Sequence, residues 1–309
     1  MSTTQNIIET RRVTKRFGAR SAVTDLSLTV PRGSAFGFLG HNGAGKTTLI
    51  RMLLGLTQAD AGSMRISGRP VPEERAAVLA RVGAIVEEPH FHGHLTGREN
   101  LRVIAAVRGP EARGRINGAL RRVGLADRAN DRVKTYSQGM RQRLGVARCL
   151  LADPELLILD EPMNGLDPGG ILELRTMIAD LTGEGRTVFL SSHLLDEVEK
   201  TCDAAAVIDR GRLIAQGPIS ELVADEHAEL DVTVDDRHAA LDLLDGHPAV
   251  AAAYPTPEGI RITLTGPDGA ASINARLVSA GVAVSRLEPV RESLEQRFLE
   301  MTSRVGGQS

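Results

Sequence analysis

The segment best suited to chemistry is a glycine-rich loop that ends in a lysine and a threonine. Residues 40–47 read GHNGAGKT and fit the pattern G-x-x-x-x-G-K-[ST]. Glycines let consecutive backbone N–H groups turn toward one anion, and the N-terminus of a following helix adds the positive end of its dipole. A lysine reaches the outer phosphates, and a threonine hydroxyl suits Mg²⁺. The loop therefore predicts a polyphosphate site built from Gly40, His41, Asn42, Gly43, Ala44, Gly45, Lys46, Thr47 and Thr48.

Two adjacent carboxylates form a second chemical feature. Asp160 and Glu161 directly follow the apolar run LLIL at residues 156–159. A buried parallel strand that ends in acids places them at the sheet edge where ligands bind in open α/β folds. We expect Asp160 to hold Mg²⁺ through water and Glu161 to orient or deprotonate the water that attacks the γ-phosphate. A helix N-cap without chemistry is the alternative interpretation of this pair.

The elements around these residues indicate an α/β core. The run at 34–39 is typical of a buried strand, and 47–54 of a helix, so the glycine-rich loop joins strand to helix. A further buried strand is expected at 186–192, ending at His193. A lone histidine after a strand is usually structural, which leaves the role of His193 open on pattern alone.

Further segments carry a family resemblance. The sequence YSQGM at 136–140 opens a helical stretch, and NGLD follows the second strand at 164–167. Together with the loop and the acidic strand end, in this order, these motifs resemble the nucleotide-binding domains of ABC transporters over residues 7–222. The fold class implied is an α/β, P-loop NTPase domain of the ABC type with a helical subdomain near 88–149. The implied cofactors are ATP and Mg²⁺.

The resemblance assigns roles that the residues alone do not. YSQGM resembles the ABC signature, which implies nucleotide binding by Ser137, Gln138 and Gly139, with Ser137 and Gly139 facing the γ-phosphate held by a second subunit. Taken alone, SQG is typical of a plain helix N-cap, which is the alternative interpretation. This copy departs from the usual LSGGQ but keeps the serine and the second glycine. Asp167 resembles the D-loop aspartate, which touches the opposing subunit. A homodimer with shared sites is the implied assembly.

Three more positions acquire roles in the same way. His193 occupies the place of the switch histidine, which senses the γ-phosphate and helps to fix the attacking water. Phe17 matches the aromatic residue that stacks on adenine, although a phenylalanine is often plain core. Glu87 stands where most members have glutamine, in a loop that joins the ATP site to the permease. The expected catalytic set is Glu161, His193, Lys46 and Glu87, and the expected metal ligands are Thr47, Asp160 and Glu87.

The departure at Glu87 narrows the resemblance. A glutamate there, together with YSQGMRQR, resembles exporter ATPases that confer self-immunity to lantibiotics, resistance to bacitracin-like peptides, or export of polyketide antibiotics. Whether Glu87 acts at the metal or in coupling to the permease stays open, and a surface acidic pair with Glu88 is the plain alternative. The nearby His90, His92 and His94 alternate as metal ligands can, but no cysteine completes a set.

Charge divides the chain near residue 224. The 309 residues carry a net charge of −2, yet residues 224–309 hold 14 acidic and 7 basic side chains. We expect an ATP-binding domain at 1–223 and an accessory α+β domain at 224–309. The latter is predicted as strand 230–234, helix 237–244, strands 249–254 and 259–264, helix 270–280, strand 282–287 and a last helix at 293–301, a ferredoxin-like order. Its acidity and few aromatics argue against RNA binding.

Composition limits the remaining functions. No apolar run approaches the ~20 residues of a membrane-spanning helix, so we expect no membrane span and a cytoplasmic location, peripheral on the membrane through a permease. Cys149 and Cys202 have neither disulfide nor zinc spacing. We expect an ATPase subunit that powers export of an antibiotic, peptide or lipid-like compound through a separate membrane permease, and no nucleic-acid partner. The alternatives are a soluble ABC ATPase acting on ribosomes or DNA, an importer subunit, and an inactive structural subunit.

Overall fold

A six-stranded, mostly parallel sheet carries the residues to which the sequence assigns chemistry. Its strand order is β10-β9-β3-β8-β7-β6, and only β10 runs antiparallel to its neighbour. Its central strands are buried along their whole length, which explains their continuous apolar runs. The strands are β3 (Ala35–Leu39), β6 (Val82–Ile85), β7 (Leu156–Asp160), β8 (Thr187–Ser192), β9 (Ala204–Asp209) and β10 (Arg212–Pro218).

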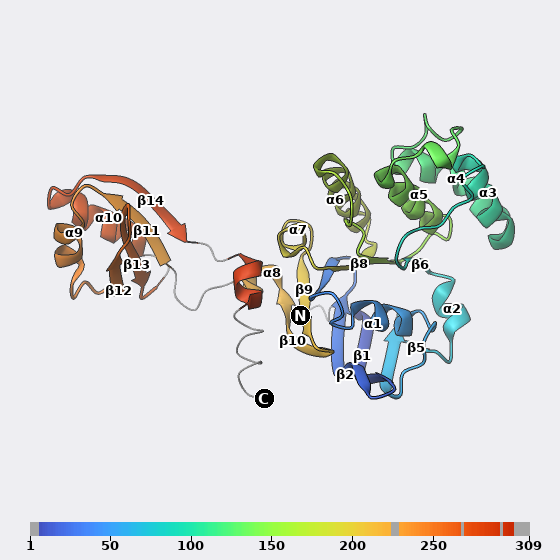
Figure 1. Cartoon of the computed structure of the whole chain (residues 1–309), viewed down its shortest axis with the longest axis horizontal. Helices are drawn as coiled ribbons and strands as arrows, with labels where there is room; N and C mark the ends of the chain where they lie inside the picture. Colours follow the sequence, from blue (N-terminus) through green and yellow to red (C-terminus); the bar gives the residue numbers. More distant parts are fainter. Residues whose placement is uncertain (1–5, 224–228, 267–268, 291–292, 300–309) are drawn as a thin grey trace. The chain divides into compact units, whose positions relative to one another are not determined.

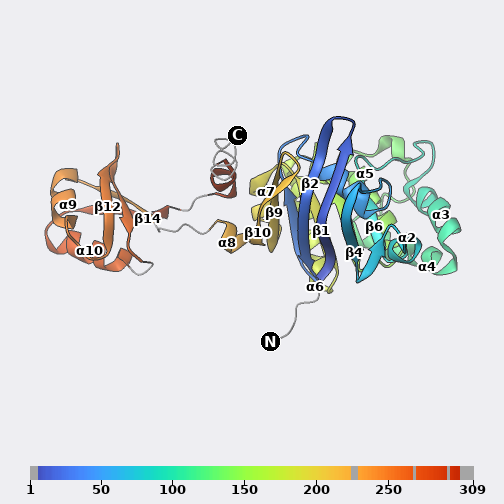
Figure 2. The same cartoon turned by 90° about the horizontal axis from the view of Figure 1, so that it is seen from below.

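The computed structural model describes residues 6–223, 229–266, 269–290 and 293–299, drawn in colour in Figures 1 and 2. These residues divide into two units. The first runs to Leu222 and also includes Phe298 and Leu299, whereas the second lies between Val223 and Arg297. The boundary between Leu222 and Val223 falls one residue before the domain boundary expected from the change in charge near residue 224.

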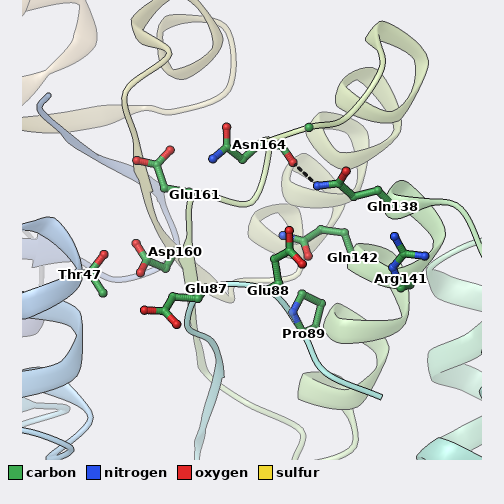
Figure 3. Close-up of a pocket in the computed structure, with 11 residues that line it drawn as sticks. Thr47, Glu87, Glu88, Pro89, Gln138, Arg141, Gln142, Asp160, Glu161 and Asn164 are labelled. Carbon is green, nitrogen blue, oxygen red and sulfur yellow. Dashed lines mark hydrogen bonds between the residues drawn. The ribbon is translucent and has the colours of Figure 1, made fainter. Parts of the chain in front are cut away.

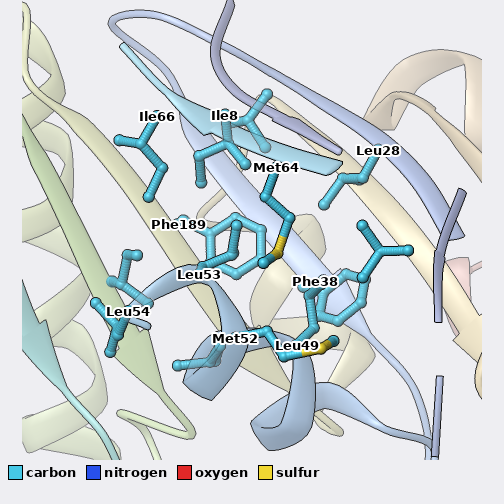
Figure 4. Close-up of a cluster of buried hydrophobic side chains, with 14 of the residues drawn as sticks. Ile8, Leu28, Phe38, Leu49, Met52, Leu53, Leu54, Met64, Ile66 and Phe189 are labelled. Carbon is cyan, nitrogen blue, oxygen red and sulfur yellow. The ribbon is translucent and has the colours of Figure 1, made fainter. Parts of the chain in front are cut away.

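A smaller antiparallel sheet belongs to the first unit. Its order is β2-β1-β4-β5, and its strands are β1 (Asn6–Phe17), β2 (Arg20–Pro31), β4 (Ala61–Ile66) and β5 (Arg69–Val71). Apolar side chains of β1, β2 and β4 meet helix α1 and the central strands in one core (Figure 4). Phe38 and Phe189 pack there with ring centroids 5.6 Å apart. This core holds α1, and with it the glycine-rich loop, against the large sheet.

Helices surround the large sheet. Three of them, α3, α4 and α5, gather at one side of the first unit in Figure 1. A capping box at Thr96 and Glu99 starts α3, and the Ser137 hydroxyl caps α5. The helices are α1 (Lys46–Leu53), α2 (Arg75–Leu79), α3 (Gly97–Arg108), α4 (Pro110–Arg122), α5 (Gln138–Leu150), α6 (Pro168–Gly183), α7 (Leu195–Glu199) and α8 (Ile219–Leu222). Among the described helices, none has both the length and the apolar character needed to cross a membrane.

The second unit has the predicted β-α-β-β-α-β order. Its antiparallel sheet runs β12-β13-β11-β14, and one face packs on both helices, as the ferredoxin-like prediction requires. The elements are β11 (Glu229–Val234), α9 (Arg237–Leu244), β12 (Val250–Pro255), β13 (Gly259–Leu264), α10 (Gly269–Ser279) and β14 (Val284–Val290).

The boundaries of the last strand and the last helix differ from the prediction. Strand β14 begins at Val284 instead of Val282, because the Val282 amide donates to the Leu277 carbonyl and closes the end of α10. Residues 294–299 are helical, and the predicted positions 300 and 301 lie outside the described residues. Phe298 of this helix is buried, and its ring meets the His41 imidazole edge-on at 4.8 Å.

Candidate active site

The glycine-rich loop joins β3 to α1, as predicted. Gly45 precedes α1 with φ +112°, in a left-handed conformation, and a Cβ there would lie 2.3 Å from the Ala22 carbonyl oxygen. Gly40 is equally confined, since its Cβ would lie 2.5 Å from the Ile208 carbonyl oxygen. Both positions therefore require glycine. The first N–H groups of α1 have no helical partner and are available to an anion.

Lys46 lies at the bottom of this loop with only 5% of its surface exposed. Its ammonium donates to the Gly40 carbonyl at 2.5 Å and the His41 carbonyl at 3.3 Å, and it lies 3.1 Å from Glu161 Oε1. A buried cation needs such partners. The loop carbonyls and Glu161 thus hold the lysine within reach of the space that the loop encloses.

The acidic end of β7 is joined to β8 by hydrogen bonds. Ser191, the register partner of Asp160, donates its hydroxyl to Asp160 Oδ1 at 2.5 Å and accepts the Glu161 amide at 3.0 Å. His193 Nδ1 lies 2.8 Å from Glu161 Oε2. Lys46, Glu161 and His193 therefore form a continuous chain of contacts across three parallel strands. The sequence located these residues separately, and the register of β7 and β8 brings them together.

One pocket joins the glycine-rich loop to Phe17. It is lined by Phe17, Arg20, Ala22, Asn42, Gly43, Gly45, Lys46, Thr47, Thr48 and Glu161. The Phe17 side chain is 55% exposed, and the Lys15 ammonium lies 5.4 Å from its ring centroid, so Phe17 is not a core residue. Sequence reasoning did not select Arg20, which also lines this pocket. Its guanidinium lies 3.4 Å from the Gly43 carbonyl oxygen.

A second pocket, shown in Figure 3, lies between the sheet edge and α5. Four carboxylates face it, and in the figure those of Asp160 and Glu87 both extend toward the Thr47 side. Its lining comprises Thr47, Glu87, Glu88, Pro89, Gln138, Arg141, Gln142, Asp160, Glu161, Asn164 and Gly165. The Thr47 hydroxyl and the Asp160 carboxylate are hard oxygen donors of the kind that Mg²⁺ prefers. The side chains of this pocket fit the predicted cation.

Glu87 has an ion-pair partner outside the lining of this pocket. Its Oε1 lies 2.6 Å from the guanidinium of Arg51, a residue of α1 that sequence reasoning did not select. Its φ of +61° is a left-handed conformation, uncommon for a glutamate. Glu87 thus forms an ion pair with α1 in addition to lying beside Glu88.

The signature segment begins α5, and its polar side chains serve the fold. Ser137 Oγ accepts the Met140 amide at 3.2 Å, and Gln138 donates to the Asn164 carbonyl at 3.0 Å. Asp167 accepts the Gly170 amide at 2.9 Å and caps α6. These capping contacts account for a serine at position 137 and an aspartate at position 167 within a single copy of the chain. Ser137 and Gly139 are absent from the described linings of both pockets.

Among the histidines that follow Glu87, the backbone of His92 is held by the Asn100 side chain. Asn100 of α3 accepts the His92 amide at 2.9 Å and donates to the His92 carbonyl at 3.1 Å. The rings of His92 and His94 lie 5.8 Å apart. Across the described parts of the chain, no three histidine, cysteine, aspartate or glutamate side chains lie close enough to share a metal ion.

Comparisons with known proteins agree with this geometry. The family model described as ABC transporter matches residues 23–164. An uncharacterized ABC transporter ATP-binding protein of Bacillus subtilis, YhcH, is 41% identical over 96% of each chain. The bacitracin transport ATP-binding protein BcrA of Bacillus licheniformis is 38% identical over 97% of this chain and 98% of its own. A solved ATP-binding subunit of an ABC transporter covers 70% of this chain and 91% of its own, with a TM-score of 0.63 and 29% identity.

Proposed function

Because the chain belongs to the family of ABC transporter ATP-binding subunits, we propose that it binds ATP with Mg²⁺ and hydrolyses it to power export through a separate membrane permease. The observation that carries this proposal is the convergence of Lys46, Glu161 and His193 beside the glycine-rich loop. These are the groups that phosphoryl transfer needs for charge stabilisation and for placing the attacking water.

Each residue has a distinct task in this proposal. The backbone amides of the loop and Lys46 hold the β and γ phosphates, while Phe17 stacks on the base. Thr47 and Asp160 hold Mg²⁺, which would neutralise charge that develops on the phosphates. Glu161 accepts a proton from the attacking water, and His193 fixes the orientation of its carboxylate through the 2.8 Å contact. Phosphates would compete with Glu161 for Lys46, so nucleotide binding frees the base.

We propose that two copies of the chain form the working unit. The Ser137 hydroxyl caps α5, which places Ser137 and Gly139 at the N-terminus of that helix, and by resemblance to the family's signature they would face the nucleotide of a second copy. Asp167 would contact the partner from the start of α6. In this assembly the first unit binds nucleotide, and the second unit, between Val223 and Arg297, is accessory. The pair would work at the inner face of the membrane through its permease.

The name of the relative BcrA favours export of an antibiotic or peptide as the transported class. The glutamate at position 87, which is unusual in the wider family, points the same way. Purification of the chain from its native membrane, followed by identification of the bound membrane protein, tests the partnership directly. Recovery of the chain with ribosomes or DNA and without a membrane protein would contradict it.

Glu161→Gln tests the assignment of the catalytic base. The amide keeps the size of the side chain but cannot accept a proton, so we expect ATP binding to persist while turnover falls by at least ~100-fold. Because hydrolysis no longer opens the assembly, sedimentation should show a dimer in Mg-ATP and a monomer without nucleotide. Glu74→Gln, which removes an exposed carboxylate outside both pockets, serves as control. A monomer in both conditions would count against the shared site.

Glu87→Ala tests coupling to the permease. We propose that Glu87 transmits movement, since Glu161 already supplies the carboxylate for hydrolysis. In vesicles reconstituted with the co-purified permease, Glu87→Ala should lower the cargo exported per ATP hydrolysed, whereas Glu87→Gln should keep most of the ATPase rate. ATPase rate and efflux are measured side by side for wild type and both variants. Unchanged efflux per ATP in Glu87→Ala would disprove the coupling role.

A further inference from the structure

Arg51 is the one cation that contacts Glu87 directly among the described residues. The guanidinium and carboxylate lie 2.6 Å apart, although both side chains are partly exposed, 45% for Arg51 and 64% for Glu87. Arg51 is four residues beyond Thr47 on α1, one helical turn along the same face. The ion pair therefore connects the helix that follows the glycine-rich loop with the loop at residues 87–89.

Negative charge is concentrated where this ion pair lies. The carboxylates of Glu87, Glu88, Asp160 and Glu161 all line one pocket. Asp160 is held by Ser191, and Glu161 is held by Lys46 and His193. Like charges that line one pocket repel one another. Arg141 also lines this pocket, but Arg51 is the described cation in direct contact with Glu87. Without Arg51, the Glu87 carboxylate would be unpaired in the pocket that also holds Thr47 and Asp160.

We propose that Arg51 is a positioning residue for Glu87. Its guanidinium neutralises the carboxylate and fastens the 87–89 loop to α1, so that a glutamate is tolerated beside the phosphates. The inference rests on the proposed ATPase function and adds a requirement to it: Arg51 is needed only while residue 87 carries a charge. A neutral glutamine at position 87 needs no counter-ion.

A double-mutant cycle on the purified full-length chain tests this requirement. The variants are Arg51→Gln, Glu87→Gln and the double variant, and the readout is the ATPase rate over a series of ATP and free Mg²⁺ concentrations. We expect Arg51→Gln to raise the KM for Mg-ATP by ~3-fold or more and to shift the half-saturating Mg²⁺ concentration upward. We expect the same substitution to change neither quantity in the Glu87→Gln background.

Two further variants separate this effect from a structural one. Arg51→Lys keeps the positive charge and should restore both constants to within about twofold of wild type. Arg69→Gln breaks an ion pair of similar length and exposure, the 2.7 Å contact with Glu74, and should leave the Mg²⁺ dependence unchanged. Thermal unfolding of every variant monitors the fold, and the exposure of Arg51 predicts a small shift in Tm.

The outcomes distinguish this inference from the function on which it rests. Arg51→Gln could raise the KM and the half-saturating Mg²⁺ concentration equally with glutamate or glutamine at position 87, or raise them in neither background. Either result would overturn the role of Arg51 and leave the proposed ATPase function intact. Absence of ATP hydrolysis by the wild-type chain, alone and with its permease, would overturn the proposed function itself. If Arg51→Gln raises both quantities with glutamate at position 87 and neither with glutamine there, the result supports the proposed pairing of Arg51 with Glu87.

Discussion

Replacing Lys46 by alanine is expected to lower the ATPase rate by at least ~100-fold, a loss typical of removing one charge-stabilising group from a catalytic site. The Lys46 ammonium is the buried cation of the glycine-rich loop and lies 3.1 Å from Glu161 Oε1. Alanine removes the charge directed at the phosphates and also leaves Glu161 without that counter-ion. The measurement is the steady-state ATPase rate in saturating Mg-ATP, with bound nucleotide followed separately.

Lys200→Ala is the matched control, because Lys200 is an exposed lysine at the end of α7. Its ATPase rate should equal that of wild type. Circular dichroism of Lys46→Ala establishes that the loss does not come from unfolding. Wild-type activity in a folded Lys46→Ala protein would mean that the glycine-rich loop is not the hydrolytic site.

Mixing two inactive variants should restore activity if each site draws residues from two chains. Ser137→Arg blocks the signature segment and Lys46→Ala blocks the glycine-rich loop, so each homodimer has two defective sites. A heterodimer has one site with both defects and one site with none. Random pairing of equal amounts makes half of the dimers mixed, which predicts about a quarter of the wild-type rate.

Heterodimer formation is verified with two affinity tags purified in sequence, before activity is assayed. Both Ser137→Arg and Ser137→Ala remove the hydroxyl that accepts the Met140 amide, and its loss weakens the start of α5. Ser137→Ala is the milder test because it adds no bulky side chain. If tagged heterodimers form and show no more activity than the separate variants, the sites are not shared between chains.

Local patterns explain why much of the site could be predicted. The spacing of Gly40, Gly45 and Lys46 reflects backbone requirements within one loop, and the apolar run before Asp160 reflects burial of a single strand. Both patterns can be recognised from neighbouring residues alone, although the close approach of the Ile208 and Ala22 carbonyls also requires glycine at positions 40 and 45. The order of elements in the second unit was equally visible, because alternation of apolar residues marks strands and turn residues separate them.

Contacts between segments distant in sequence could not be predicted from those patterns. Ser191 joins Asp160 to the Glu161 amide only because β7 and β8 pair in a particular register. Arg51 lies within the helix predicted at 47–54, and nothing in the sequence around it indicates a contact with Glu87. The N-cap at Ser137 was the plain alternative to a signature serine and is present in the structure, whereas the capping contact of Asp167 was not foreseen, although Asp167 precedes a helix in the manner of an N-cap.

The return of the chain to the first unit at Phe298 makes the second unit an insertion instead of a tail. Ending the chain after Leu222 would delete an entire folded unit and, in addition, the aromatic neighbour of His41 in the glycine-rich loop. Excising residues 229–290 and bridging the gap with a flexible linker would remove the inserted unit but keep Phe298. Accessory units exchanged between related subunits would accordingly need two junctions, one on each side of the insertion.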